Sequence, residues 1–189
     1  MRLYKGTRPY KIVQQLAVGG GVLLISLVNP VAGAGIVKDI MRQYFRGKYF
    51  ERQRFLNDLA HLQRRELIDW KETPDGMVRM TLTKNGRVKI LEYKLDEMHV
   101  EKPARWDRKW RLVVFDVPVD KKQARDALGV KLVELGFYPL QKSVYLMPFP
   151  CEDQIEFIAT VFDVRKNVLI LYVSNFEGEE KLMRHFGLI

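Results

Sequence analysis

The sequence predicts an α+β protein with two domains, and three observations support this prediction. Segments with the 3.6-residue period of helices alternate along the chain with segments typical of strands. Hydrophobic residues make up 47% of the 189 residues, which is enough to build compact cores. A charged stretch over residues 96–108 has no apolar period and contains Pro103, as expected for a linker. We therefore predict a first domain over residues 1–102 and a second over residues 103–189.

The composition narrows the choice of partner and compartment. Lys and Arg total 32 against 23 Asp and Glu, giving a net charge of +9 and a pI near 9.6. A basic surplus of this size favours a polyanionic partner, with nucleic acid ahead of anionic lipid. Cys151 is the only cysteine, which excludes an internal disulfide and a cysteine-based metal cage. A single thiol is typical of a reducing compartment, so we predict a cytoplasmic protein.

An uncharged run over residues 12–37 allows a membrane interpretation, because it is long enough to cross a bilayer. Its basic start and small-residue end also resemble a signal peptide. Against both interpretations, Gln14 and Asn29 are poor membrane residues, and the three glycines at 19–21 weaken any single helix through the run. We therefore predict helices buried in a small domain, and no membrane partner.

Two helices are predicted within this run and just beyond it. Because proline disfavours a helical residue before it, Pro30 divides the run. The first predicted helix extends from about Tyr10 to Val28, and the second from about Ala34 to Phe45, where apolar residues recur at helical spacing. We expect Gly47 to stop the second helix.

A third helix, from about Tyr49 to Arg65, carries the main functional signal. Its apolar residues fall on one face at three- and four-residue steps. The opposite face collects amides, arginines and a histidine, namely Gln53, Arg54, Asn57, His61 and Arg64. Amides and arginines suit base edges and phosphates, although a charged helical face is more often only solvated surface. We predict that the stretch from Lys48 to Arg65 meets duplex DNA.

A β-hairpin is predicted directly after this helix. Leu67–Thr73 and Met77–Thr83 alternate in hydrophobicity and flank a Pro-Asp-Gly sequence, which is a strong turn signal. Lys71 and Arg79 lie on the predicted hairpin, where they would reach a phosphate backbone. Three helices followed by a basic hairpin predict a winged helix-turn-helix domain.

The sequence around this hairpin resembles the wing and following helix of many bacterial winged-helix regulators. The resemblance rests on Leu67-Ile68, the Pro-Asp-Gly turn, and Leu82-Thr83-Lys84-Asn85-Gly86. Thr83 is the predicted N-cap of the helix, which would extend to about Met98.

In the second half of the sequence, the pattern predicts the order strand, helix, strand, strand, helix and strand, followed by a short helix. The predicted segments are 110–117, 120–135, 137–140, 143–147, 152–162, 167–173 and 177–186. Asp120 is the expected cap of the first of these helices, and Gly136 its expected stop. The order is that of a ferredoxin-like domain.

The local sequence of the predicted second domain shows a second resemblance. Lys109-Trp110-Arg111-Leu112-Val113-Val114-Phe115-Asp116-Val117-Pro118 resembles the first strand of the small CRISPR-associated spacer-acquisition endonuclease. Gly136-Phe137 and Leu140-Gln141-Lys142-Ser143-Val144-Tyr145 resemble its second and third strands. The same strings occur in the central domain of the phenylacetic-acid-degradation repressors, the PaaX family, after an N-terminal winged helix. The resemblance covers roughly residues 40–175. It implies a repressor-like transcriptional regulator that reads double-stranded DNA and forms a homodimer through its ferredoxin-like domain.

Asp116 leaves an enzymatic alternative open. In the endonuclease family the matching aspartate ends the first strand, and the dimer brings two of them around a divalent metal. The resemblance therefore implies, as an alternative, a Mg²⁺-dependent endonuclease acting on DNA or RNA with Asp116 as metal ligand and catalytic residue. No second acidic residue is placed by spacing to join it, and the repressors keep a similar aspartate. We expect a structural role for Asp116 and no required cofactor.

Overall fold

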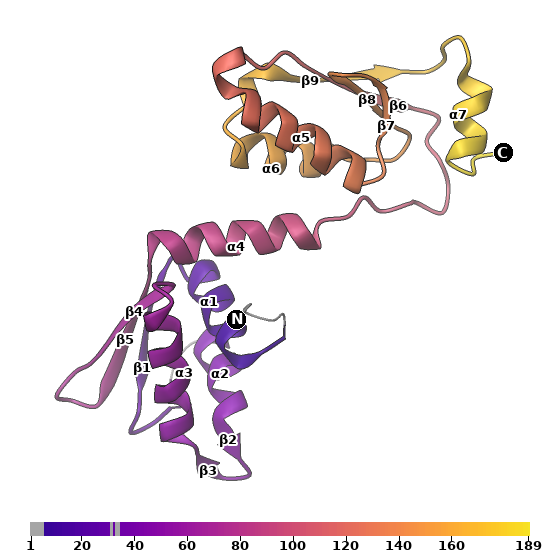
Figure 1. The fold of residues 1–189 in the computed structure, drawn as a ribbon. Coiled ribbons are helices and arrows are strands. Elements are labelled where there is room, and N and C mark those ends of the chain that lie inside the picture. The colour runs from indigo at the N-terminus through magenta and orange to yellow at the C-terminus, as the bar shows by residue number, and fades with distance from the viewer. Residues whose placement is uncertain (1–5, 31, 33–34) are drawn as a thin grey trace. The chain divides into compact units, whose positions relative to one another are not determined.

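The computed structural model describes residues 6–30, 32 and 35–189 of the chain (Figure 1). Helices and strands are mixed throughout, which confirms the α+β class. The internal contacts divide the chain into two compact units, one ending at residue 94 and the other beginning at residue 95. This division falls in the last turn of α4 (Lys84–Glu97), a little before the start of the second domain predicted at residue 103.

The first unit is an antiparallel three-stranded sheet with helices packed on one face. Its further elements are α1 (Arg8–Val18), β1 (Val22–Ser26), α2 (Gly35–Met41), the 3-10 helix η1 (Arg42–Tyr44), β2 (Phe45–Arg46), β3 (Tyr49–Phe50), α3 (Arg52–Arg64), β4 (Ile68–Glu72) and β5 (Met77–Leu82). The strand order in the sheet is β1-β5-β4, and β2 and β3 form a separate short hairpin. One core joins α1, α2, α3 and the inner face of the sheet, with Leu16, Ile40, Phe55 and Met80 fully buried in it.

The prediction of one helix from Tyr10 to Val28 is wrong. α1 ends at Val18, and Gly20 and Gly21 follow with φ of +78° and +89°. Only glycine adopts such angles without steric cost, so the chain turns there and returns as β1, antiparallel to β5. An apolar run cannot by itself distinguish a buried strand from a buried helix, which is why the strand was missed. Among the described residues, no helix has the length and apolarity needed to cross a membrane.

The second predicted helix also ends earlier than expected. Ala34, its predicted start, lies outside the described residues; α2 stops at Met41, and Phe45 is already in a strand. Gly47, with φ of +61°, stands in the tight turn between β2 and β3 and does not stop a helix. As a result Tyr49 belongs to a strand, and α3 begins at Arg52.

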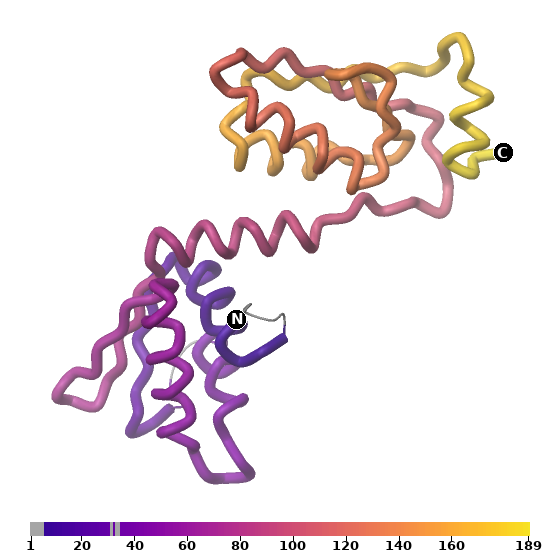
Figure 2. The backbone as a smooth tube through the Cα atoms, in the orientation of Figure 1, coloured from indigo at the N-terminus to yellow at the C-terminus, as the bar shows by residue number. Residues whose placement is uncertain are grey.

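The predicted β-hairpin and its following helix are confirmed. β4 and β5 pair antiparallel from Ile68↔Leu82 to Glu72↔Val78, and Figure 2 shows the chain reversing between them. The Thr83 hydroxyl accepts a hydrogen bond from the Gly86 amide at 3.0 Å, so Thr83 caps α4 as predicted.

The second unit is an antiparallel four-stranded sheet in the order β7-β8-β6-β9. Its elements are β6 (Trp110–Phe115), the 3-10 helix η2 (Val119–Lys121), α5 (Lys122–Glu134), β7 (Tyr138–Gln141), β8 (Val144–Met147), α6 (Glu152–Val161), the 3-10 helix η3 (Arg165–Asn167), β9 (Val168–Val173) and α7 (Glu179–His185). α5 and α6 cover one face of the sheet (Figure 1). On the other face, Leu182 of α7 packs with Trp110 and Leu146 at one end only. Gly136, with φ of +87°, follows α5 as predicted.

Asp120 does not cap α5, contrary to prediction. It lies inside η2, which intervenes between β6 and α5. The residue that precedes α5 is Lys121, and neither it nor Pro118, which precedes η2, makes a side-chain capping bond.

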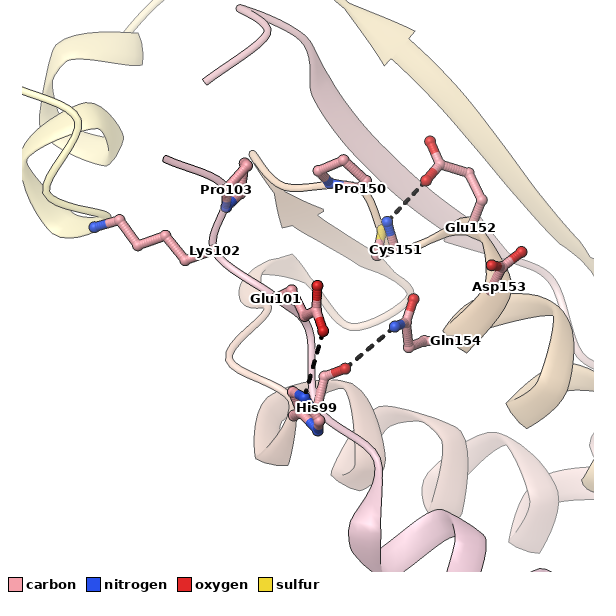
Figure 3. Close-up of a pocket in the computed structure, with 9 residues that line it drawn as sticks. All are labelled: His99, Glu101, Lys102, Pro103, Pro150, Cys151, Glu152, Asp153 and Gln154. Carbon is pink, nitrogen blue, oxygen red and sulfur yellow. Dashed lines mark hydrogen bonds and ion pairs between the residues drawn. The ribbon is translucent and has the colours of Figure 1, made fainter. Parts of the chain in front are cut away.

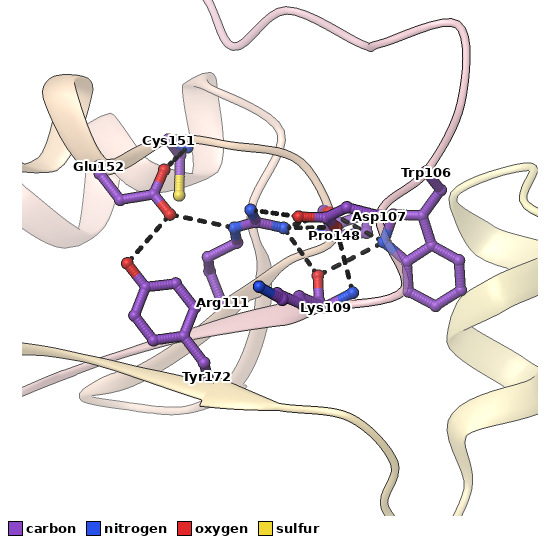
Figure 4. A network of polar contacts seen from close by, with 8 residues as sticks. All are labelled: Trp106, Asp107, Lys109, Arg111, Pro148, Cys151, Glu152 and Tyr172. Carbon is purple, nitrogen blue, oxygen red and sulfur yellow. Dashed lines mark hydrogen bonds and ion pairs between the residues drawn. The ribbon is translucent and has the colours of Figure 1, made fainter.

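Arg111 anchors the segment that leads into β6 (Figure 4). Its side chain is buried, and it donates to both carboxylate oxygens of Asp107, at 2.9 and 2.7 Å, and to Glu152 at 3.2 Å. It also donates to the carbonyls of Lys109 and Pro148, at 2.9 and 3.1 Å. The end of the predicted linker is therefore fastened to the second unit.

Candidate nucleic-acid interface

The net positive charge of the chain comes entirely from the first unit. Residues 1–94 contain 18 Lys and Arg against 8 Asp and Glu, a net charge of +10. Residues 95–189 contain 14 against 15, a net charge of −1. A polyanion would therefore be attracted to the first unit and not to the second.

The predicted polar face of α3 exists on the folded chain. Phe55, Leu59 and Leu62 are fully buried, so the opposite side of the helix faces solvent. On that side Gln53, Arg54, Asn57 and Arg64 are exposed and His61 is half-buried. One helix thus presents all five predicted side chains together.

The N-terminal part of this face is ordered by polar contacts. The Gln53 amide donates to the Asn57 side-chain oxygen at 3.0 Å, which sets two amides side by side one turn apart. Arg54 donates to Glu51 at 2.6 Å, and this hydrogen bond raises the pKa of Arg54. One guanidinium nitrogen of Arg52 donates to both carboxylate oxygens of Glu72 in β4, at 2.7 and 2.8 Å, which ties the start of α3 to the β4–β5 hairpin.

Asp58 fixes α3 to the rest of the first unit. Its carboxylate accepts from Arg8 of α1 at 3.0 Å and from the Tyr44 hydroxyl at 2.8 Å. Burial, and then the nearby Asp58 charge, raise the pKa of Tyr44, so its hydroxyl stays protonated and keeps donating. Sequence reasoning missed Asp58 because its arginine partner lies 50 residues away in the chain.

The structure does not bring Lys71 and Arg79 onto the α3 side of the sheet. Trp70 and Met80 pack in the core that α3 shares, and side chains alternate between the two faces of a strand, so Lys71 and Arg79 project from the other face. They are direct cross-strand partners, and both are exposed. Like charges in this position destabilise a hairpin, so a bound anion between them would relieve a repulsion.

Lys48 is also separate from α3. It lies in the turn of the β2–β3 hairpin, directly before the helix, and it is exposed. Among the described residues, no salt bridge involves it.

Asp116 stands alone at the end of β6. Its backbone amide donates to the Asn167 carbonyl at 3.0 Å, and its own carbonyl accepts from the Asn167 side-chain amide at 2.8 Å. The carboxylate is exposed and forms no hydrogen bond or ion pair with any described residue. Within the described ranges, no three His, Cys, Asp or Glu side chains are grouped to hold a metal ion.

A cavity of about 410 Å³ lies beside the start of α6 (Figure 3). Its lining residues are His99, Glu101, Lys102, Pro103, Pro150, Cys151, Glu152, Asp153 and Gln154. Burial raises the pKa of Cys151 to about 12, so the thiol is protonated at neutral pH and a poor nucleophile. Glu152 is already engaged by Arg111 and by the Cys151 amide. These side chains do not form a nucleophile–base pair.

Comparison with known protein families finds one similarity, which lies within the second unit. Residues 103–183 match the family model described as the PaaX protein central Cas2-like domain. The matched residues extend from before β6 into α7. The resemblance to PaaX-like proteins is thereby confirmed. Among curated proteins, none matches this chain.

Proposed function

We propose that this protein is a DNA-binding transcriptional regulator of the repressor type, which reads duplex DNA with its first unit and forms a homodimer through its second. The observation that carries the proposal is the net positive charge of the unit whose α3 presents an exposed face of amides and arginines. The match to a PaaX central domain supports the regulatory role, which the resemblance to the PaaX repressors implies.

The order of elements supports this assignment. The first unit has the element order of a winged helix-turn-helix with α3 as the recognition helix. Its three helices, α1, α2 and α3, precede the β4–β5 hairpin, and its sheet has the order β1-β5-β4. In the second unit, strand-helix-strand-strand-helix-strand in the order β7-β8-β6-β9 corresponds to a ferredoxin-like fold.

The open face of the second sheet supports a homodimer. Leu112 pairs across strands with Leu171, and Val114 with Leu169, on the face opposite α5 and α6. Leu169 is 63% exposed and Leu171 is 48% exposed. A second copy related by a twofold axis would cover this apolar face and hold two recognition helices for two half-sites.

In the proposed complex α3 lies in the major groove. The neighbouring amides of Gln53 and Asn57 suit the paired donor and acceptor of adenine, and Arg64 suits guanine or phosphate. Arg54 contributes after it leaves Glu51, while Lys71 and Arg79 bind backbone phosphates from the outer face of the hairpin.

Alanine in place of Arg54 or Asn57 is expected to lower affinity for the preferred duplex about ten- to hundred-fold and to blur base preference. The measurement is selection of bound sequences from a random duplex pool, followed by titration of the selected duplex by fluorescence anisotropy. Lys181→Ala, an exposed cation in the second unit, is the control and should bind as wild type.

Unchanged affinity and base preference in both variants would exclude this docking of α3. Running the selection with and without Mg²⁺ also tests the nuclease alternative. Strand cleavage that needs the metal and disappears in Asp116→Ala would replace the proposed function with an enzymatic one.

Glu51→Gln is expected to raise affinity for DNA about two- to five-fold. The substitution releases Arg54 from its ion pair and removes a negative charge beside the proposed phosphate-binding surface. Anisotropy titration at low salt measures the gain. Glu92→Gln is the matched control, because Glu92 also forms an exposed pair with a basic residue three positions away, Lys89. Equal affinities for wild type and Glu51→Gln would show that the ion pair does not compete with DNA.

A further inference from the structure

The short β2–β3 hairpin directly precedes α3 and packs against the core of the first unit. Phe45 pairs with Phe50 across the strands, their ring centroids lie 5.5 Å apart, and both pack against the first core. The Phe50 ring also lies 6.3 Å from that of Phe55 in α3, and the Glu51 amide donates to the Tyr44 carbonyl at 2.8 Å. The hairpin is therefore held by the same core that holds the recognition helix.

The tip of this hairpin exposes two basic side chains and one aromatic side chain, namely Arg46, Lys48 and Tyr49. Arg46 pairs with Tyr49 across the strands, so both side chains lie on the face opposite the two phenylalanines. Tyr49 is 82% exposed, the largest exposure of any aromatic side chain among the described residues. Arg46 and Lys48 form no ion pair in the described part of the chain, whereas Arg52 and Arg54 nearby both do.

The position of the tip suits a nucleic acid that also meets α3. The β2–β3 turn, the first turn of α3 and the β4–β5 turn lie toward the same end of the first unit (Figure 1). The ion pair between Arg52 and Glu72 confirms that the start of α3 is next to β4. A duplex placed along α3 therefore has one flank beside the hairpin tip.

We propose that the β2–β3 hairpin is a third DNA-contacting element, which grips the phosphate backbone beside the groove occupied by α3. Arg46 and Lys48 bind adjacent phosphates, while the Tyr49 ring packs on a deoxyribose and its hydroxyl donates to a phosphate. These contacts add affinity and fix the position of α3, and they carry no base preference. The inference rests on the proposed function, since it requires the first unit to bind duplex DNA.

The test compares wild type with the double variant Arg46→Ala/Lys48→Ala, Tyr49→Ala and Tyr49→Phe, by anisotropy titration over a series of salt concentrations. The double variant should bind selected and unrelated duplexes more weakly alike, and should flatten the dependence of log affinity on log salt by about 1.8, or about 0.9 for each lost phosphate contact. Tyr49→Ala should lower affinity for DNA several-fold. Tyr49→Phe should bind more tightly than Tyr49→Ala, because it keeps the ring contact with deoxyribose, but more weakly than wild type, because it lacks the hydroxyl.

The matched control is Lys11→Ala/Lys94→Ala, which removes two exposed cations from α1 and α4 at the same cost in net charge. Its salt dependence should equal that of wild type. If wild type binds DNA but the hairpin variants keep its affinity and salt dependence, or change no more than this control, the hairpin inference is overturned and the proposed function stands.

Failure of wild type to bind any duplex would overturn both proposals together. Binding of the tip to vesicles of phosphatidylglycerol, lost in the same variants while DNA binding is unchanged, would assign the hairpin to an anionic membrane instead.

Discussion

Replacing Arg111 with alanine is expected to destabilise the second unit by about 3 kcal/mol, the lower end of the range for breaking a buried ion pair. Arg111 is only 4% exposed, and its removal leaves Asp107 and Glu152 without their cation. The carbonyls of Lys109 and Pro148 lose a donor as well. The lower end applies because both carboxylates are more than a third exposed, so water replaces part of the lost interaction. Urea unfolding followed by tryptophan fluorescence measures the loss.

Two comparisons identify the role of Arg111. Arg111→Lys keeps the charge but cannot form the planar bidentate pair with Asp107, so it should recover only part of the stability. Tyr172→Phe removes a single hydrogen bond to Glu152 and should cost far less than Arg111→Ala. A loss below about 1 kcal/mol in Arg111→Ala would contradict the network as a structural anchor.

The same network predicts the effect of acid. The hydrogen bond from Arg111 lowers the pKa of Asp107. Burial alone would raise the pKa of Glu152, but backbone hydrogen bonds and Arg111 outweigh it, so this pKa is also lowered. A carboxyl whose folded pKa is lowered stabilises the protein above its unfolded pKa, about 4, and loses that contribution as the pH falls through the folded value. Wild-type stability should therefore decline below about pH 4, and less steeply in Arg111→Ala.

Gly86→Ala is expected to destabilise the first unit by about 3 kcal/mol, near the upper end for overpacking. A Cβ at this position would lie 2.1 Å from the Leu67 carbonyl oxygen and 2.7 Å from a Leu82 methyl carbon. The helix would gain about 1 kcal/mol from the greater propensity of alanine, which the clash with a backbone atom outweighs. Urea unfolding measures the change, and DNA binding should weaken with it.

The control is the other glycine within a long helix, Gly129 of α5. A Cβ there would meet only the Tyr145 side chain, with its hydroxyl at 2.8 Å, and no backbone atom. Gly129→Ala should therefore cost clearly less than Gly86→Ala. Equal stability of wild type and Gly86→Ala would mean that α4 shifts away from Leu67 without cost.

Gly86 also gives a physical reason for the sequence Leu82-Thr83-Lys84-Asn85-Gly86. Thr83 must cap the helix and Gly86 must let it pass close to the Leu67 carbonyl, so both residue types are fixed by the strand-to-helix connection. Such local chemistry is readable from sequence, as are the Pro-Asp-Gly turn and the helical period of α3.

Interactions between distant segments were not readable in the same way. β1 was missed because its apolar residues, such as Ile25, suit a helix and a strand equally, and only pairing with β5 decides. Asp58 depends on Arg8, which lies 50 residues away in the chain, and on the Tyr44 hydroxyl. Arg111 did leave a signal, since a charged residue within a buried strand must find partners.

If the first unit binds duplex DNA as proposed, the separation of charge between the two units has a consequence for how the protein finds its site. With a net charge of +10 on one unit and −1 on the other, the field of a duplex would attract the first unit and not the second. Non-specific binding to DNA would then depend on the first unit, whereas the proposed dimer contact uses the apolar sheet face of the second. In the proposed regulator, the search for an operator and the assembly of the dimer would therefore depend on different units.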